Sequence, residues 1–502
     1  MPSARLRKLL LAALAAAALV GASFMQDRLL RDRDELGLTR TAALENAPPL
    51  LAFTTVALGG FRGLVANSLW IRMSQLQEDG KYFEMVQLSD WLTKLTPTVA
   101  QVWIHLAWNM AYNVSVQIPD LPARWPWVRR GIELLRDEGL RYNPHNVAIY
   151  RELAWLYQHK MGADLDDAHW VYKREWAAEM SPFFGGAPVD WARLTGPQSE
   201  EDRLRARALR ELYKIDPLVA QKVDERYGPL DWRLPETHAI YWGFLGLENA
   251  RTEEQLIQLR RVIFQSMQLA FRRGRLTMLQ GVKDGDLQRF EIGPNLGIVD
   301  KVDLAFTEMM RDDGQFRDNI GNAYKNFLRD ATYFLYTHNR EAEARRWFDR
   351  ARQSFTNAIP DGMTLDDYAV SRVTEVAGDT GRDRTTLILE GLIGRSFYNL
   401  AVGDQDQAVS FDRLARRVWE RYMKETEFKT IRGNEQVKVD RVLLDPLPVM
   451  KSRVASQMLD PENGLEPLFA ANLRLALNLP AGTTNVPPPA VTTNAPAAPP
   501  PP

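Results

Sequence analysis

Hydrophobic residues recur every three or four positions through most of the chain between residues 50 and 475, which is the period of an amphipathic helix. In Tyr82–Leu95 the spacing places most apolar side chains on one stripe, and Pro97 follows the segment. Similar patterns predict helices over Val99–Val116, Val128–Leu140 and Val147–Met161, the last one closed by Gly162. The sequence therefore predicts an all-α protein.

Two short stretches, Phe290–Ile298 and Val437–Leu444, have β-branched and aromatic residues beside Gly or Asn. They predict one or two small hairpins attached to the helices. Because the helical pattern is also least regular over residues 276–300, we expect this stretch to separate an N-terminal helical block, 48–275, from a C-terminal block, 301–479.

Three segments share a spacing of small and large side chains across two successive helices. Their positions are Tyr150, Leu153, Ala154, Tyr157, Gly162, Ala168 and Tyr172 before Pro182; Ala331, Phe334, Ala344, Phe348 and Ala351; and Leu392, Phe397, Leu400, Gly403, Ala408, Phe411 and Ala415. Small residues let helices approach closely, and large ones fill the gaps between neighbours.

This spacing resembles the tetratricopeptide-repeat family, over about half of the chain, and more generally uncharacterised membrane-anchored bacterial proteins with such repeats. The resemblance implies an α-solenoid, a superhelix of stacked antiparallel helix pairs. Such a superhelix would present an extended concave face to a protein or peptide partner.

The N-terminus has the pattern of an export signal. The basic n-region, residues 1–8, contains Arg5, Arg7 and Lys8, and an uninterrupted apolar run, Leu9–Phe24, follows it. This order fits a retained single-pass transmembrane anchor, a cleaved signal peptide, or a buried helix. The charged residues 25–47 then form a stalk. With the anchor retained, the positive-inside rule places the body in the periplasm, on the bacterial inner membrane; cleavage would secrete it.

A second apolar stretch, Pro48–Trp70, contains Arg62 and Asn67, with two glycines at its centre. A mid-span arginine costs about 2.5–3.5 kcal/mol on insertion scales. We therefore expect the first helix of the folded body here, with a second span as the alternative.

The tail from Pro480 to Pro502 contains nine prolines and no charged residue. Such a segment cannot form a hydrophobic core and is predicted to be disordered and partly polyproline-like. It could act as an inert extension, a spacer or a docking strand.

Composition narrows the function classes. Lys plus Arg total 63 and Asp plus Glu 64, for a net charge of −1, which argues against nucleic acid as a partner. The absence of cysteine excludes disulfides, thiol catalysis and Cys-ligated metal sites. Phosphate-loop, HExxH and GxSxG motifs are also absent from the sequence, so we predict no enzyme, no cofactor and no metal.

The densest polar cluster consists of His159, Asp164, Asp166, Asp167 and His169. These side chains could ligate a divalent metal, but the same aspartates would also cap the helix that follows. The capping interpretation is favoured, and we assign no metal site.

Tryptophan is concentrated in the first half of the chain. In a concave groove the rings could anchor a peptide or stack on sugars; in the core they would fill wide gaps between helices. Trp125-Pro126-Trp127, predicted to lie in a loop, is the first candidate for partner binding. Trp103 and Trp108 are the next candidates.

These patterns favour a membrane-anchored scaffold that binds a protein or peptide at the extracytoplasmic face. The alternative is a carbohydrate-active or carbohydrate-binding α/α toroid, in which tryptophans would flank two carboxylates. A subunit of a membrane complex is a third possibility. The sequence leaves the oligomeric state undetermined.

Overall fold

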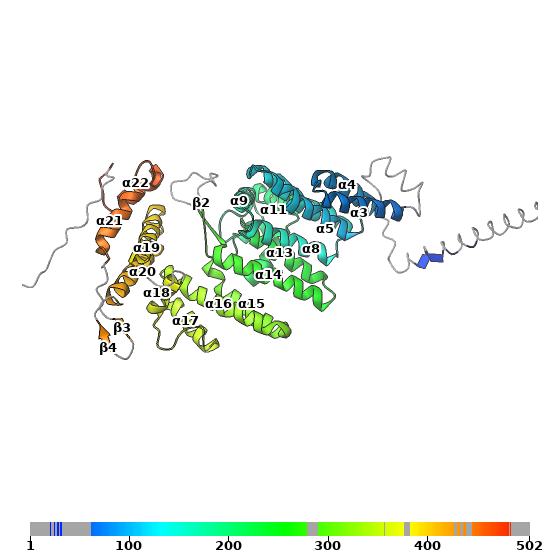
Figure 1. The fold of residues 1–502 in the computed structure, drawn as a ribbon. Helices are drawn as coiled ribbons and strands as arrows, with labels where there is room; N and C mark the ends of the chain where they lie inside the picture. The colour runs from blue at the N-terminus through cyan, green and yellow to red at the C-terminus, as the bar shows by residue number, and fades with distance from the viewer. Residues whose placement is uncertain are drawn as a thin grey trace, which may run out of the picture. The chain divides into compact units, whose positions relative to one another are not determined.

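A computed structural model of the chain describes residues 62–278, 290–355, 357–375, 382–425, 429–431, 435–437, 444–480 and Gly482, with a few isolated residues before residue 33. This part is helical apart from two short hairpins, which confirms the all-α prediction (Figure 1). Apart from those isolated residues, the predicted basic region, anchor and stalk lie outside the described residues, as does the tail beyond Gly482. No helix within the described ranges is long and apolar enough to cross a bilayer.

The contacts divide the chain into two compact units, Met1–Leu153 and Ala154–Pro502, here called the first and second unit. The first unit contains α3 (Arg62–Glu78), α4 (Tyr82–Leu95), α5 (Ala100–Trp108), η2 (Asn109–Val114), η3 (Ser115–Gln117), η4 (Pro122–Arg124), α6 (Trp125–Glu133), η5 (Leu134–Gly139), α7 (Leu140–Tyr142) and most of α8 (Val147–Trp155). Its α4 has the predicted bounds and ends before Pro97.

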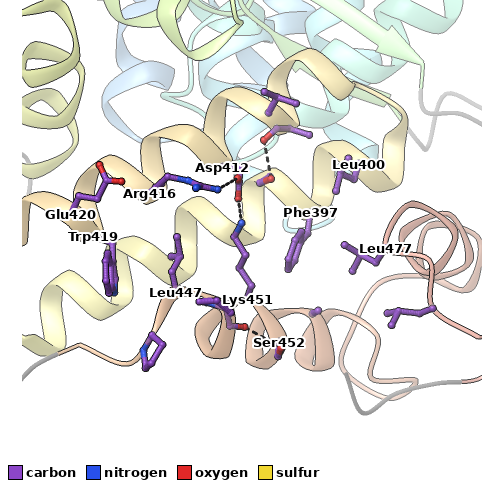
Figure 2. Close-up of a pocket in the computed structure, with 17 residues that line it drawn as sticks. Phe397, Leu400, Asp412, Arg416, Trp419, Glu420, Leu447, Lys451, Ser452 and Leu477 are labelled. Atoms are coloured by element: carbon purple, nitrogen blue, oxygen red, sulfur yellow. Dashed lines mark hydrogen bonds and ion pairs between the residues drawn. The ribbon is translucent and has the colours of Figure 1, made fainter. Parts of the chain in front are cut away.

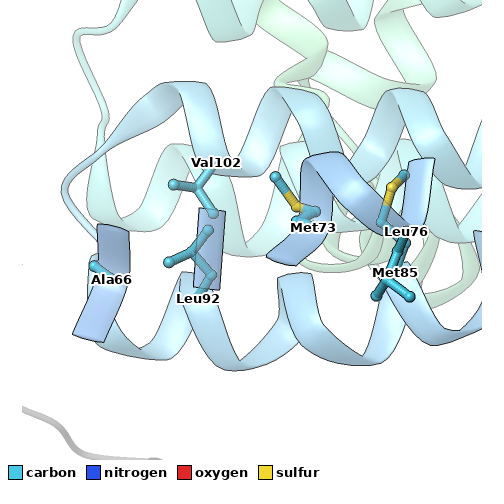
Figure 3. Packing of buried hydrophobic residues seen from close by; sticks show 6 residues of the cluster. All are labelled: Ala66, Met73, Leu76, Met85, Leu92 and Val102. Carbon is cyan, nitrogen blue, oxygen red and sulfur yellow. The ribbon is translucent and has the colours of Figure 1, made fainter. Parts of the chain in front are cut away.

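One hydrophobic cluster joins the first three helices of this unit. Ala66 and Met73, seven residues apart on α3, share a stripe that packs against Met85 and Leu92 of α4 and against Val102 of α5 (Figure 3). Seven residues make about two helical turns, so Ala66 and Met73 lie on the same face of α3, and this is the face that packs against α4 and α5.

The other three predicted helices of the N-terminal region each pass from α-helical into π-helical turns: η2, η5 and η6 (Leu156–Gly162). The prediction that Trp125-Pro126-Trp127 lies in a loop is wrong, because these residues open α6. Proline is tolerated in the first turn of a helix, where its missing N–H has no helical partner to lose.

The second unit begins in α8 and contains η6, α9 (His169–Phe184), α10 (Trp191–Thr195), α11 (Glu200–Leu212), α12 (Pro217–Tyr227), α13 (Pro235–Asn249), α14 (Glu253–Arg273), η7 (Leu296–Ile298), α15 (Val299–Asp312), η8 (Gly314–Phe316), α16 (Arg317–Thr337), α17 (Glu341–Ser354), α18 (Leu365–Glu375), α19 (Arg382–Val402), α20 (Gln405–Glu425), α21 (Leu447–Met458) and α22 (Pro467–Ala476). The stretch between α14 and η7 holds β1 (Arg275–Met278) and β2 (Phe290–Gly293), paired antiparallel with Arg275 opposite Gly293.

The second hairpin joins β3 (Lys429–Ile431) and β4 (Glu435–Val437). The prediction of a β-strand within Phe290–Ile298 is thus confirmed over the four residues of β2. For Val437–Leu444, the structure shows only that Val437 ends β4, because residues 438–443 lie outside the described part.

Packed helix pairs are the main building element of the second unit. Three pairs, α13 with α14, α16 with α17, and α19 with α20, are each joined by two or three residues and pack along their length. Such short connections make each pair an αα-hairpin. In the last pair Gly403 takes φ +86° directly after α19, a backbone conformation that suits glycine at a helix C-terminus.

The small and large residues singled out in the second and third repeat segments lie on these hairpins. Ala331, Ala344 and Ala351 are fully buried in α16 and α17, and Ala408 and Ala415 are buried in α20. Ala408 also accepts a hydrogen bond from the Ser396 hydroxyl of α19 through its backbone carbonyl, at 2.8 Å. The small residues of these two segments are therefore buried within the helix pairs, and at Ser396 and Ala408 the two helices α19 and α20 are in direct contact.

Candidate functional site

An open cavity of about 840 Å³ lies in the second unit between α19, α20 and α21 (Figure 2). We call it the groove. Helix α19 packs against α20, α21 and α22 and forms the floor, while α20 and α21 form the two walls. The groove continues to Leu477 and Leu479, directly after α22.

The lining of the groove is mostly apolar. Phe397 and Leu400 come from α19, Leu447 begins α21, and Val409 of α20 is 56 % exposed. Trp419 is half-buried and donates its indole N–H to the Asp445 carbonyl oxygen at 3.0 Å, which ties the ring to the segment leading into α21. Exposed apolar surface of this kind marks a binding region more often than isolated apolar side chains do.

Charged groups of both signs border this apolar surface. The Lys451 ammonium of α21 reaches across to the Asp412 carboxylate of α20 and forms an ion pair with it (Figure 2). The Arg416 guanidinium lies 3.9 Å from the same carboxylate. A groove with an apolar floor and a neutral pair at its wall suits an uncharged, extended ligand better than a charged one.

A second cluster of charged side chains lies in the same unit, on η6, α9, α13 and α14 and on the segment between η6 and α9. Lys160 and Lys173 are both only 2 % exposed. Lys160 is ion-paired with Asp166, and the Lys173 ammonium lies 3.3 Å from Asp164. Arg273 of α14 also pairs with Asp164. We call these five residues, together with Glu236 and His169, the buried charge network.

Hydrogen bonds complete most of this network. Asp166 accepts from the Ala168 backbone N–H at 2.8 Å, just before α9 begins. The Lys173 ammonium lies 2.9 Å from His169 Nδ1. Burial lowers the pKa of Lys173, whereas the neighbouring carboxylates oppose that shift. The aspartates therefore hold buried cations in place.

Glu236 is the exception. It is 2 % exposed, and its Oε2 has no hydrogen-bond partner among the described residues. Burial raises its pKa to about 7, although Lys173 and Arg273 act in the opposite direction. A carboxyl in such a site is mainly neutral below pH 7.

Aromatic rings enclose a buried histidine two residues further along α13. His238 lies 4.8 Å from the Trp176 ring, 5.4 Å from the Tyr157 ring and 5.8 Å from the Trp232 ring, centroid to centroid. Its Nε2 bonds to the Trp232 carbonyl at 2.8 Å. Burial lowers the pKa of His238 to about 4, so the ring is neutral at ordinary pH. These surroundings indicate that His238 is part of the hydrophobic core.

The residues considered above as metal ligands contact other side chains of the protein. Asp164 and Asp166 face lysines, and His159 stacks on Trp155 at 4.4 Å. In the described part of the chain, no group of three or more His, Asp and Glu side chains is placed to hold a metal. The sequence contained the signal for this pairing, since Lys160 and Lys173 flank the acidic run.

The four tryptophans proposed for partner binding lie in the first unit. Trp103 and Trp125 are buried, and Trp103 donates to the Pro97 carbonyl at 2.8 Å. Trp108 is 37 % exposed and stacks on Tyr112, and Trp127 packs edge-on against Phe83. Only Trp108 and Trp127 therefore offer ring surface to solvent, and partner binding by them stays a prediction.

Sequence reasoning missed the groove. Its lining comes from three helices and from two segments outside them, one before α21 and one after α22, and Val409, Trp419 and Leu447 have no common spacing in the chain. Comparison with known proteins gives no matching family model, no significantly similar curated protein and no significantly similar solved structure.

Proposed function

We propose that this chain is a binding protein whose groove holds an extended, apolar and uncharged segment of a polypeptide partner. The observation that carries the proposal is the groove itself, about 840 Å³ in volume, with Val409 exposed and Trp419 half-buried beside a neutral ion pair. Docking of a peptide segment into an apolar groove is a common mode of peptide recognition.

The architecture we propose around the groove is the solenoid implied by the repeat resemblance. Its support is the succession of hairpins from α13 to α20, in which α14 also packs on α15, and α16 on both α18 and α20. In a solenoid each repeat contacts mainly its neighbours, which leaves an extended face for a partner.

We also propose that Leu9–Phe24 holds this body at the extracytoplasmic face of a membrane. The support is the order of a basic segment followed by an apolar run. Protease treatment of intact cells and of disrupted cells tests the proposal. We expect the body to be protected in intact cells and cleaved once the outer barrier is opened; cleavage only after the inner membrane is lysed would contradict it.

A random library of 12-residue peptides displayed on phage tests the groove. We expect the full chain to enrich uncharged peptides rich in proline, valine and leucine. Val409→Asp places a charge in the groove and should abolish the enrichment. The matched control is Leu387→Asp, because Leu387 is 68 % exposed on α19 but does not line the groove.

Three results would contradict the proposed function. They are enrichment of no peptide, enrichment that survives Val409→Asp, and enrichment lost equally in both variants. Binding of polysaccharide probes by the same surface, in place of peptides, would favour the carbohydrate alternative.

A further inference from the structure

The groove opens beside the point where the uncharged, proline-rich segment begins. Resting on the proposed function, we propose that the groove is occupied by the chain's own segment Val486–Val491, Val-Pro-Pro-Pro-Ala-Val, which a partner segment must displace. The occupant is thus an intramolecular ligand.

The distances allow this occupancy. Leu479 lines the groove, and only six residues, 480–485, separate it from Val486. An extended chain of six residues spans about 20 Å, which suffices for the segment to enter the groove beside Leu477.

The α20 wall from Ala408 to Glu420 is about 18 Å long at 1.5 Å per residue. Six residues in a polyproline helix cover about 19 Å. The segment and the wall therefore match in length.

The side chains of the segment also fit the lining. A polyproline helix repeats every three residues, so Val486 and Pro489 share one face, and Pro488 and Val491 another. Such ligands dock into grooves lined by aromatic and apolar side chains, here Phe397 and Trp419. Val486 and Val491 are the largest side chains between Ala481 and Pro502, apart from the prolines themselves and polar Thr and Asn.

Hydrogen bonding favours the same occupant. The carbonyl groups of a polyproline helix have no internal partner, and proline has no N–H. The occupant therefore needs donors from the groove and few acceptors. Arg416 supplies donors at the α20 wall, and Lys451 supplies them at the α21 wall. Because the segment has no charge, it leaves the Lys451–Asp412 pair undisturbed.

Attachment to α22 makes weak intrinsic affinity sufficient. A short flexible connection gives an effective concentration in the millimolar range, so a segment with a Kd near 1 mM would already occupy the groove in a large fraction of molecules. A partner present at micromolar concentration then needs higher affinity than the tail, which sets a threshold for binding.

Cysteine cross-linking tests the occupancy directly, because the natural chain contains no cysteine. The full chain with Val409→Cys and Val486→Cys has only these two thiols. We expect mild oxidation to form an intramolecular disulfide at least tenfold faster than in the control with Leu475→Cys and Val486→Cys. Leu475 is closer to Val486 in sequence and 79 % exposed, but lies outside the groove.

A third variant adds Pro488→Asp to the Val409→Cys, Val486→Cys chain. The new charge should expel the segment and slow cross-linking to the rate of the control. Equal rates for the two cysteine pairs, a disulfide formed only between two copies of the chain, or no effect of Pro488→Asp would each overturn the inference.

The phage library separates this inference from the proposed function. If the segment occupies the groove, Pro488→Asp alone should increase peptide enrichment severalfold over the unmodified chain. Equal enrichment in both forms would overturn self-occupancy and leave the groove as a peptide site. No enrichment in either form would overturn the proposed function itself.

Discussion

A lysine–aspartate pair stands in each of two regions of the second unit, and the surroundings differ. In the buried charge network, the side chains of Lys160 and Asp166 are 2 % and 8 % exposed. In the groove, those of Lys451 and Asp412 are 28 % and 30 % exposed. The first pair is enclosed by packed helices, whereas the second borders an open apolar surface. The region in which charged residues are most concentrated in the sequence is therefore the enclosed, structural one. The candidate binding site is lined instead by apolar residues that do not stand out in the sequence.

The largest expected effect is on the buried pair. Lys160→Ala leaves Asp166 buried without its cation and should cost about 3–5 kcal/mol of unfolding free energy. Urea denaturation followed by far-UV circular dichroism measures the loss. As a control, Lys94→Ala breaks the pair with Asp90, whose side chains are 34 % and 45 % exposed, and should cost less than about 1 kcal/mol. Similar losses in both variants would remove the distinction between enclosed and open pairs.

A pH-dependent effect is expected from Glu236. Because its pKa is raised from 4.5 to about 7 in the folded chain, the folded chain keeps a proton between these pH values that the unfolded chain has released. The stabilisation by this group is therefore complete below pH 4.5 and is lost as the pH rises through 7. Glu236→Gln should thus gain stability relative to the natural chain on going from pH 4.5 to 8, by on the order of 1–3 kcal/mol.

Denaturation at a series of pH values checks the Glu236 prediction. Glu248→Gln is the matched control, since Glu248 lies on the same helix and is exposed. Its stability should follow that of the natural chain at every pH. A Glu236→Gln curve parallel to the natural one would show that the carboxyl is ionised in the folded chain and that the network has a partner for it.

The smallest expected effect on stability is at the groove. Lys451→Ala removes a partly exposed pair and should change the unfolding free energy by less than about 1 kcal/mol. It should nevertheless weaken binding of library-selected peptides severalfold, because Asp412 loses its closer cation and keeps only Arg416, 3.9 Å away, so more of its negative charge faces an apolar ligand. Fluorescence anisotropy with a labelled peptide measures the change. A large stability loss with unchanged peptide affinity would assign the groove pair a structural role.

Helix positions were the most predictable part of this molecule. The apolar period and Pro97 fixed α4 to the residue, and the spacing of small residues located the α16–α17 and α19–α20 hairpins. The π-helical turns η2, η5 and η6 were not predictable, since apolar spacing predicts a helix but does not distinguish i→i+5 from i→i+4 backbone hydrogen bonds over a single turn. Trp125-Pro126-Trp127 was misassigned because proline reads as a turn signal in sequence but also suits the first turn of a helix.

The candidate site was largely unpredictable for a different reason. A groove depends on which helices approach each other, and the residues that line this one, such as Phe397 and Leu447, look like ordinary core positions in the sequence. The buried charge network was partly predictable. Its aspartates stood out, and Lys160 and Lys173 lie close to them in the chain, but Arg273 comes from the distant helix α14 and was not visible as a partner in the sequence.

The most direct test of the central claim, that the groove is a polypeptide-binding surface, is calorimetric titration of the most enriched 12-residue peptide into the full chain and its variants. Val409→Asp should weaken binding at least tenfold, which corresponds to about 1.4 kcal/mol, and Leu387→Asp should leave the Kd unchanged. The same Kd for all three chains, or an equal loss in both variants, would contradict the claim.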